Sequence, residues 1–344
     1  MRPPLAALVA LTFLAGGPAV LAQTRVGTTS APFLTMNAGA RTTALGGATT
    51  ASVSGAEALL WNPGAAASAS TVGEGGVLLS HQELFADITH DVGALTVPLG
   101  AGVVGLHVVA VDYGRIEVTT EFDEDTGETY GASDLAAGLT YALPLTDRFA
   151  FGGTVKYIRQ SIRDMSGQSV AVDLGFVLET PYLNGARLAA SIRNFGAALQ
   201  MEGVNARVFI DPDPGSTGNN DQVPGTYDIS AWNLPLSFEL GVSIPAVRQG
   251  NAEVRLLADV EQINDYDLNG DLGAEALYRL GDVELAGRVG YQNWTANADA
   301  VASHLSYGAG VEVDAGRVRL GVDFAYVPFD FLGSARLIDL RLTF

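Results

Sequence analysis

The chain has 344 residues, with 38 acidic and 19 basic side chains, a formal net charge of −19 and no cysteine. This balance excludes nucleic acid as a partner, because phosphate binding needs clustered Lys and Arg. The lack of cysteine excludes disulfides, thiol catalysis and a lipid-anchored cysteine. Only 17% of residues are charged and 48% are apolar, which is unusual for an exported soluble protein.

Residues 1–22 have the three regions of a secretory signal peptide: a positive start at Arg2, an apolar stretch over 5–14 and an A-x-A-like site ending at Ala22. We expect cleavage there; an uncleaved N-terminal helix fits less well. Neither this stretch nor any later run reaches the roughly 18 apolar residues of a transmembrane helix. An exported, apolar, glycine-rich chain without such helices indicates a closed β-barrel, which also satisfies its backbone in lipid.

From residue 74 onward the sequence alternates with a period of two. In 317–326, the positions from Val318 to Tyr326 place apolar side chains on one face, while the other face carries Gly, Ala and isolated charges. A soluble sandwich has a more polar outer face, so this pattern favours a narrow barrel interior. The number of such segments is fourteen, an even number, as bacterial outer-membrane barrels require. Fourteen segments are expected, near 76–84, 87–97, 102–112, 131–143, 149–162, 168–179, 186–196, 233–245, 252–263, 271–280, 282–293, 302–314, 317–328 and 335–344.

The connections alternate in length. Those after even-numbered segments are short, whereas the two longest, 113–130 and 197–232, follow odd-numbered ones. Short periplasmic turns and long extracellular loops give this alternation, so both ends of the barrel belong on the periplasmic side. Aromatic residues near segment ends fit interfacial girdles as a group, although each alone has an ordinary packing explanation. They are Tyr113, Tyr157, Tyr182, Trp232, Tyr291, Trp294, Tyr326 and Phe329. The last segment ends in register at Phe344, which resembles the signal that barrel-insertion machinery reads.

Three sequence features that often indicate a cofactor, metal or catalytic site are incomplete here. The G-x-G-x-x-G run at 100–105 crosses a tight turn between strands instead of opening a helix. The acidic run 265–271 resembles an EF-hand opening but has Ala276 at position twelve and no flanking helices, so an acidic hairpin loop is favoured and weak calcium binding stays open. The four histidines lie apart and no G-x-S-x-G elbow occurs, so we expect no enzyme, no metal centre and no cofactor.

Charged residues of both signs fall on the inward face. Because a buried charge costs several kcal/mol unless it is paired, we expect a cross-lumen network or contacts with a plug, and a filled interior instead of an open pore. The inward charges are Lys156, Asp173, Arg255, Asp259, Glu261, Arg288, Arg319, Asp323, Asp339 and Arg341.

Ahead of the strands, residues 39–68 are rich in Gly and Ala and nearly free of charge. Several motifs together resemble the PorV/PorQ family within the FadL-like outer-membrane barrels, well over 27–200 and mainly in pattern beyond. They are Phe33-Leu34, Gly39-Ala40-Arg41, Ala44 to Ala48, Leu59 to Pro63, Tyr113 to Ile116, Ala132 to Leu135, Gly153 to Ile158 and Ile192 to Gly196.

The resemblance implies an all-β fold, a closed antiparallel barrel of about 14 strands over 74–344, with a part-helical hatch over 23–73 plugging the lumen. Small residues would let the hatch pack closely, and its Arg and Glu could pair with lumen charges. The family usually has Ala after Asn-Pro; Gly64 stands there, which leaves the turn geometry in question. The hatch residues singled out are Gly39, Arg41, Gly46, Gly47, Glu57, Asn62 and Pro63.

The resemblance implies a non-enzymatic, integral outer-membrane protein with two candidate functions. In the first, as in PorV, the barrel is an accessory of type IX secretion that accepts secreted clients at the cell surface. In the second, as in FadL, hydrophobic molecules enter through the loops and leave by a lateral gap. A structural barrel with neither role is a third reading. The first is favoured, because the resemblance is closest to that branch and the acidic loop 113–130 disfavours anionic fatty acids.

The expected partners are outer-membrane lipids, the insertion machinery and secreted clients or secretion-system subunits, with hydrophobic ligands under the alternative. Four apolar residues in or beside the longest loop suit either a client or a hydrophobic ligand: Phe209, Ile210, Tyr227 and Trp232.

Overall fold

The computed structural model describes residues 27–68, 73–121, 126–212, 215, 222–293, 305–329 and 333–344. The expected signal peptide, Trp294 and the acidic run 123–125 lie outside these residues.

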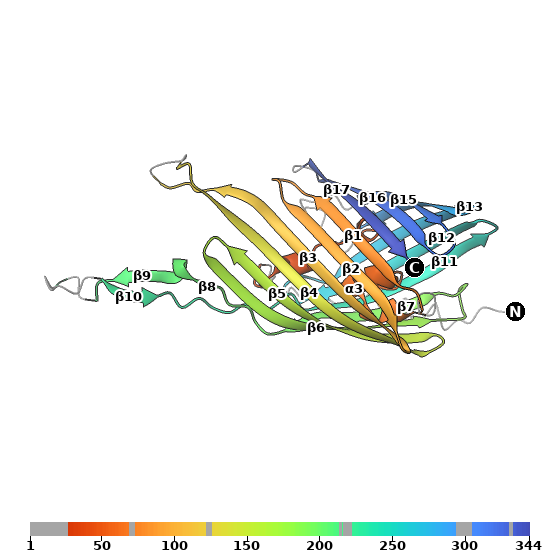
Figure 1. The fold of residues 1–344 in the computed structure, drawn as a ribbon, viewed down its shortest axis with the longest axis horizontal. Coiled ribbons are helices and arrows are strands. Elements are labelled where there is room, and N and C mark those ends of the chain that lie inside the picture. Colours follow the sequence, from red (N-terminus) through yellow and green to blue (C-terminus); the bar gives the residue numbers. More distant parts are fainter. Residues whose placement is uncertain are drawn as a thin grey trace, which may run out of the picture.

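Within the described residues, fourteen long antiparallel strands close into one barrel (Figure 1). Neighbours in the ring follow chain order: β7 pairs with β11, β5 with β6, and β17 returns to β1. This confirms the fold class expected from the sequence. The strands are β1 (Gly76–Glu83), β2 (Thr89–Leu99), β3 (Gly102–Glu117), β4 (Thr129–Thr146), β5 (Phe149–Ile162), β6 (Met165–Glu179), β7 (Arg187–Gly196), β11 (Ser237–Gln249), β12 (Ala252–Ile263), β13 (Asn269–Leu280), β14 (Val283–Tyr291), β15 (Leu305–Asp314), β16 (Arg319–Phe329) and β17 (Gly333–Thr343).

Several strands differ from their expected ranges. β3 runs on to Glu117 and β4 begins at Thr129, which shortens the expected loop 113–130, and the start of β11 is displaced. β11 begins at Ser237 instead of 233. The preceding residues leave the ladder because their carbonyls accept other bonds: Asn233 from the backbone of Ser30, and Leu234 from the side chain of Asn264. β11 also runs on to Gln249, past a register shift next to Pro245, a residue that has no N–H to donate.

The alternation seen in the sequence matches the two faces of the wall. In β16, Leu320, Val322 and Phe324 point outward and are about half exposed, whereas Asp323 and Ala325 point inward and are fully buried. Two residues assigned to the aromatic girdles lie elsewhere. Tyr113 sits at a register shift and its hydroxyl donates to the inward Asp134, and Trp232 bridges to Leu199 in the long loop.

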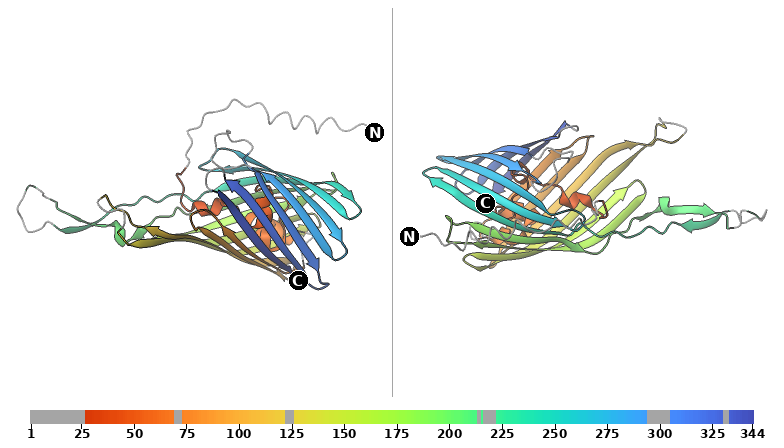
Figure 2. Two further views of the ribbon diagram at one scale, coloured as in Figure 1. Left: turned by 90° about the horizontal axis from the view of Figure 1, so that it is seen from above. Right: turned by 180° about the vertical axis from the view of Figure 1, so that it is seen from behind.

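Short helical turns lie inside the barrel (Figure 2). They are η1 (Pro32–Thr35), α2 (Ala40–Ala44), η2 (Gly55–Glu57), α3 (Ala58–Trp61) and η3 (Pro63–Ala67). We call residues 27–68 the hatch. No helix among the described residues is long and apolar enough to cross a membrane. The main apolar core forms between hatch and wall, where Val53, Leu59 and Trp61 pack with Leu78 and Val103.

The connection from β7 to β11 extends far beyond the barrel end (Figure 1). It contains β8 (Glu202–Gly203), η4 (Val204–Ala206), β9 (Arg207–Ile210) and β10 (Val223–Thr226), of which β9 and β10 pair only with each other in the described chain. We call residues 202–228 the outer hairpin. In outer-membrane barrels the long-loop end is extracellular and the short-turn end is periplasmic, and the two ends of this barrel are named in that sense.

A charge on the outward face tests whether that face meets lipid. Val322 is half exposed on the outward face. If it lies near the bilayer midplane, Val322→Arg is expected to destabilise the barrel by about 2–4 kcal/mol, because the added charge would meet lipid. Urea unfolding in phospholipid vesicles, followed by heat-modifiable migration on a gel, measures the loss. Gln249→Arg, at an exposed periplasmic turn, is the control; equal stability of the two variants would contradict a lipid-facing wall.

Candidate functional site: a filled lumen and an outer hairpin

The hatch runs through the lumen from the extracellular end to the periplasmic end. At the extracellular end, the Thr29 hydroxyl donates to Asp265 at 2.5 Å, and the Ala31 N–H donates to the Gln160 side chain at 2.9 Å. Further along, α2 packs on β15 and β16, and η3 packs on β4, β5 and β6. The segment then reaches the periplasmic start of β1, with η2 against β1 and β2.

Small residues bring the hatch backbone onto the barrel backbone. Gly46 has a left-handed φ of +68°, and a Cβ on it would lie 2.8 Å from the Tyr291 nitrogen. Opposite, a Cβ on Gly290 would overlap the Gly46 backbone itself. Glycine on both sides therefore permits this approach. Gly47 is similarly close to Asp271, and Gly39 begins α2 beside Asp339.

The Asn62-Pro63-Gly64 turn is tied to β6. The Asn62 side chain donates to the carbonyls of Thr50 and Phe176 at 3.1 and 3.0 Å and accepts from the Gly64 N–H at 3.2 Å. A Cβ on Gly64 would overlap the carbonyl oxygen of Gly175. Glycine in place of the expected alanine thus has a physical reason: the turn lies directly on the wall.

Arg41 joins the hatch to the wall through a buried carboxylate. Its guanidinium donates to Glu275 at 3.0 and 3.1 Å and to Glu57 at 3.3 Å. Burial alone would lower the Arg41 pKa, but the Glu275 and Glu57 carboxylates outweigh it and raise that pKa, so Arg41 is charged.

The same carboxylate extends the network around the barrel. Glu275 also accepts from Arg288 at 2.8 Å and from Arg255 at 3.4 Å. Arg288 then pairs with Asp323 at 2.6 Å, and Asp323 with Arg341 at 2.6 Å. Arg341 also pairs with Glu312 of β15 at 3.4 Å, so the six consecutive strands from β12 to β17 are linked to the hatch in this way.

A second network lies on the opposite wall. Lys156 pairs with Asp173 at 2.9 Å and bonds to the side chain of Asn194. Nearby, Arg193 pairs with Glu239 and stacks over the Trp61 ring of the hatch at 4.7 Å. On the hatch side, Thr50 donates its hydroxyl to Glu239 at 2.8 Å and its N–H to Asp259 at 2.7 Å.

The structure thus places the expected hatch residues and inward charges along one hatch–wall interface, with Arg319 at the periplasmic mouth, where it pairs with Glu74 at 2.5 Å. Sequence reasoning missed the residues that join the two sides: Glu275, Glu239 and Arg193. The signal was present for Glu275, which is a charged residue at an inward position of the alternating run 271–280.

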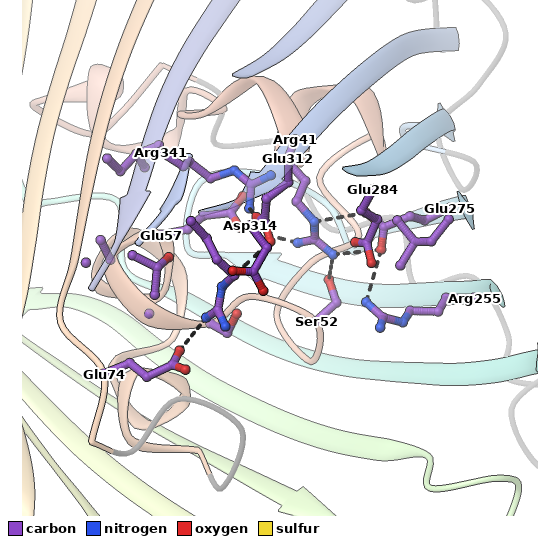
Figure 3. Close-up of a pocket in the computed structure, with 18 of the residues that line it drawn as sticks. Arg41, Ser52, Glu57, Glu74, Arg255, Glu275, Glu284, Glu312, Asp314 and Arg341 are labelled. Atoms are coloured by element: carbon purple, nitrogen blue, oxygen red, sulfur yellow. Dashed lines mark hydrogen bonds and ion pairs between the residues drawn. The ribbon is translucent and has the colours of Figure 1, made fainter. Parts of the chain in front are cut away.

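A cavity of about 750 Å³ lies below the hatch at the periplasmic end (Figure 3). Arg41, Ser52 and Glu57 of the hatch close its inner end, and residues near the short turns, such as Gly281 and Asp282, surround its mouth. Its lining is polar and charged. We call this cavity the periplasmic vestibule.

The remaining expected residues lie away from this interface. Phe209, Ile210 and Tyr227, in or beside the outer hairpin, are exposed, and so is Trp232 in the same connection. Phe344 exchanges two backbone bonds with Gly75 at the periplasmic end. In the EF-hand-like run, Asp265 binds Thr29 and Asp271 accepts from the Asn293 N–H. No group of three metal-binding side chains occurs among the described residues.

The barrel fold is similar to that of solved hydrocarbon channels and of a FadL homologue. A TodX mutant described as a monoaromatic hydrocarbon channel matches with a TM-score of 0.57 at 14% identity, covering 89% of this chain and 98% of that one. The toluene transporter TbuX of Ralstonia pickettii matches with 0.56 at 12%, covering 89% and 97%. A FadL homologue of Pseudomonas aeruginosa matches with 0.55 at 11%, also covering 89% and 97%. At these identities the likeness concerns the fold.

The family model described as type IX secretion system protein PorV matches residues 20–177, a little under half of the chain. The resemblance drawn from the sequence is therefore confirmed: residues 20–177 are similar to the PorV family model, and the fold is similar to that of the FadL homologue. A closed β-barrel with these similarities is expected in an outer membrane. No curated protein matches the chain.

Removal of the shared carboxylate tests how firmly the hatch is held. Glu275→Gln leaves Arg41, Arg255 and Arg288 under-compensated in a buried site, so a loss of about 3–5 kcal/mol is expected. Urea unfolding of the detergent-solubilised protein, followed by tryptophan fluorescence, measures it. Glu284→Gln, which breaks a pair with the exposed Arg279, should change stability by no more than about 0.5 kcal/mol. Equal effects would show that the network does not hold the hatch.

The Gly64 contact gives a second prediction. Gly64→Ala forces a methyl group against the β6 backbone and should cost about 1–3 kcal/mol by overpacking. Gly287→Ala is the matched control, because no described atom lies within 4 Å of the added methyl. Gel migration after graded heating compares them, and a Gly64→Ala variant as heat-resistant as the control would contradict the close packing.

Proposed function

We propose that this protein is an accessory of type IX-like protein secretion that binds secreted clients at the cell surface through the outer hairpin. One observation carries the proposal. A two-stranded sheet stands away from the barrel with both edges unpaired among the described residues and with large apolar side chains in water.

Such a hairpin is suited to a protein partner. Two strands alone are marginally stable in water, so an extended pair gains stability when another chain covers it. Phe209 and Ile210 are neighbours in β9 and point to opposite faces, and both are more than half exposed. A client strand could pair with either edge while its side chains cover these residues.

The match to the PorV family model adds support for the secretion role. Transport of hydrophobic molecules, as in the toluene transporters, has less support. Apolar space in the outer part of the lumen is filled by the chain itself, where Phe33 packs with Ile158, Leu199 and Leu234. The periplasmic vestibule is lined by charges, so a hydrophobic molecule has no apolar way out along the barrel axis and would depend on a lateral gap in the wall.

The test compares two double variants of the hairpin. Phe209→Ser with Tyr227→Ser removes two exposed aromatic anchors and should lower client recovery at least about tenfold, the loss expected when interface anchors are removed. Arg207→Ser with Asp228→Ser changes exposed neighbours and is the control. Affinity purification from native outer membranes with mass spectrometry measures client recovery.

Normal client recovery with the aromatic variant would contradict the hairpin as the binding element. Absence of any secreted or surface protein from the wild-type sample, together with a bound hydrophobic molecule that survives detergent, would support the transporter instead.

A further inference from the structure

The periplasmic vestibule has a wall rich in arginine. Arg187 at the start of β7, Arg248 at the end of β11 and Arg255 in β12 all line it, and Ser243 lies beside Arg187 in the ladder. We call these four residues the arginine wall. Arg41 closes the cavity nearby, and both Arg41 and Arg255 lie close enough to Arg187 to repel it.

Within this wall, Arg187 is the least compensated cation. Arg255 reaches Glu253 at 2.5 Å and Glu275 at 3.4 Å, and Arg248 reaches Glu253 at 3.2 Å. For Arg187, the closest carboxylate oxygen, on Glu179, lies 3.9 Å from Nε, and Nη2 makes a long 3.4 Å bond to the Val53 carbonyl. Its Nε is buried without a hydrogen-bond partner among the described residues. The unpaired donor and the distant carboxylate leave the Arg187 guanidinium weakly compensated, and an anion in the vestibule would supply the missing negative charge.

The opposite side of the vestibule restricts which anion fits. That side carries charges of both signs, because Glu284 pairs with Arg279, and Glu312 pairs with Arg319 and Arg341; Asp282 and Asp314 also line it. Since these charges largely balance one another, Arg187 is the weakly compensated cation of the lining, which suits one negative charge better than an anion that carries several, such as phosphate. A single carboxylate carried on a peptide chain supplies that charge, and the N–H groups of the chain can donate to the carboxylates of the lining.

The shape of the vestibule restricts the ligand further. The hatch closes the inner end, while the mouth lies among the periplasmic turns (Figure 3). An extended chain can therefore enter only by one of its ends, and the volume of about 750 Å³ accommodates a few residues.

From this geometry we propose that the arginine wall binds the terminal carboxylate of a peptide chain that enters from the periplasm, with Arg187 as the principal donor. The site lies at the opposite end of the barrel from the outer hairpin and does not depend on client binding there.

The test uses the detergent-solubilised full chain and two fluorescent Gly-Ser-Gly-Ala peptides, one ending in a free carboxylate and one in an amide. Fluorescence anisotropy measures their affinities for the wild type, Arg187→Gln and Arg163→Gln. The last removes the same charge at an extracellular turn and is the matched control. Heat-modifiable migration establishes that each variant is folded.

The free acid should bind the wild type and Arg163→Gln at least about tenfold more tightly than the amide does, as expected for a charge-assisted bond, and Arg187→Gln should abolish this difference. Three results would overturn the proposal: equal affinity for acid and amide, an acid preference that survives in folded Arg187→Gln, or displacement of the peptide by inorganic phosphate at equal concentration.

Discussion

A single buried carboxylate links the hatch to the wall. Glu275 accepts from Arg41 of the hatch and from Arg288 and Arg255 of neighbouring strands. None of these charges would be tolerated alone at this depth, because a buried ion without a partner costs several kcal/mol. The hatch therefore completes the charge balance of the barrel as well as filling its space.

Close glycine contacts between hatch and wall accompany this pairing of buried charges. Gly46 against Gly290, and Gly64 against Gly175, bring the backbones close enough for the short side chains of Thr50 and Asn62 to reach the wall. Close packing also excludes water, which strengthens the ion pairs. Ion pairs and apolar clusters consequently lie side by side along the hatch: Arg41 pairs with Glu275, while Ala40 and Ala44 pack with Leu337.

The strands could be predicted from the sequence because the alternation of side chains, the even number of segments and the alternating loop lengths can all be read along the chain. In β16, the side chains that the alternation places on the outward face do point outward. Two kinds of feature could not. The start of β11 depends on Ser30 and Asn264, distant residues that take its carbonyls from the ladder. The pairing of Arg41 with Glu275 depends on where the hatch passes, which no spacing along the chain reveals. The family resemblance predicts Ala at position 64. Glycine is required there because the turn packs against the backbone of Gly175 in β6, a contact that the sequence does not reveal.

The end-to-end path of the hatch has a consequence for biogenesis. The hatch directly precedes β1, and β1 must pair with β17, the last strand in the sequence, to complete the ring. Once that seam forms, residues near Ser30 could reach the far rim only by passing through an interior already occupied by side chains. Enclosure of the hatch while the ring is still open avoids that passage, because the sheet then folds around its own N-terminal segment.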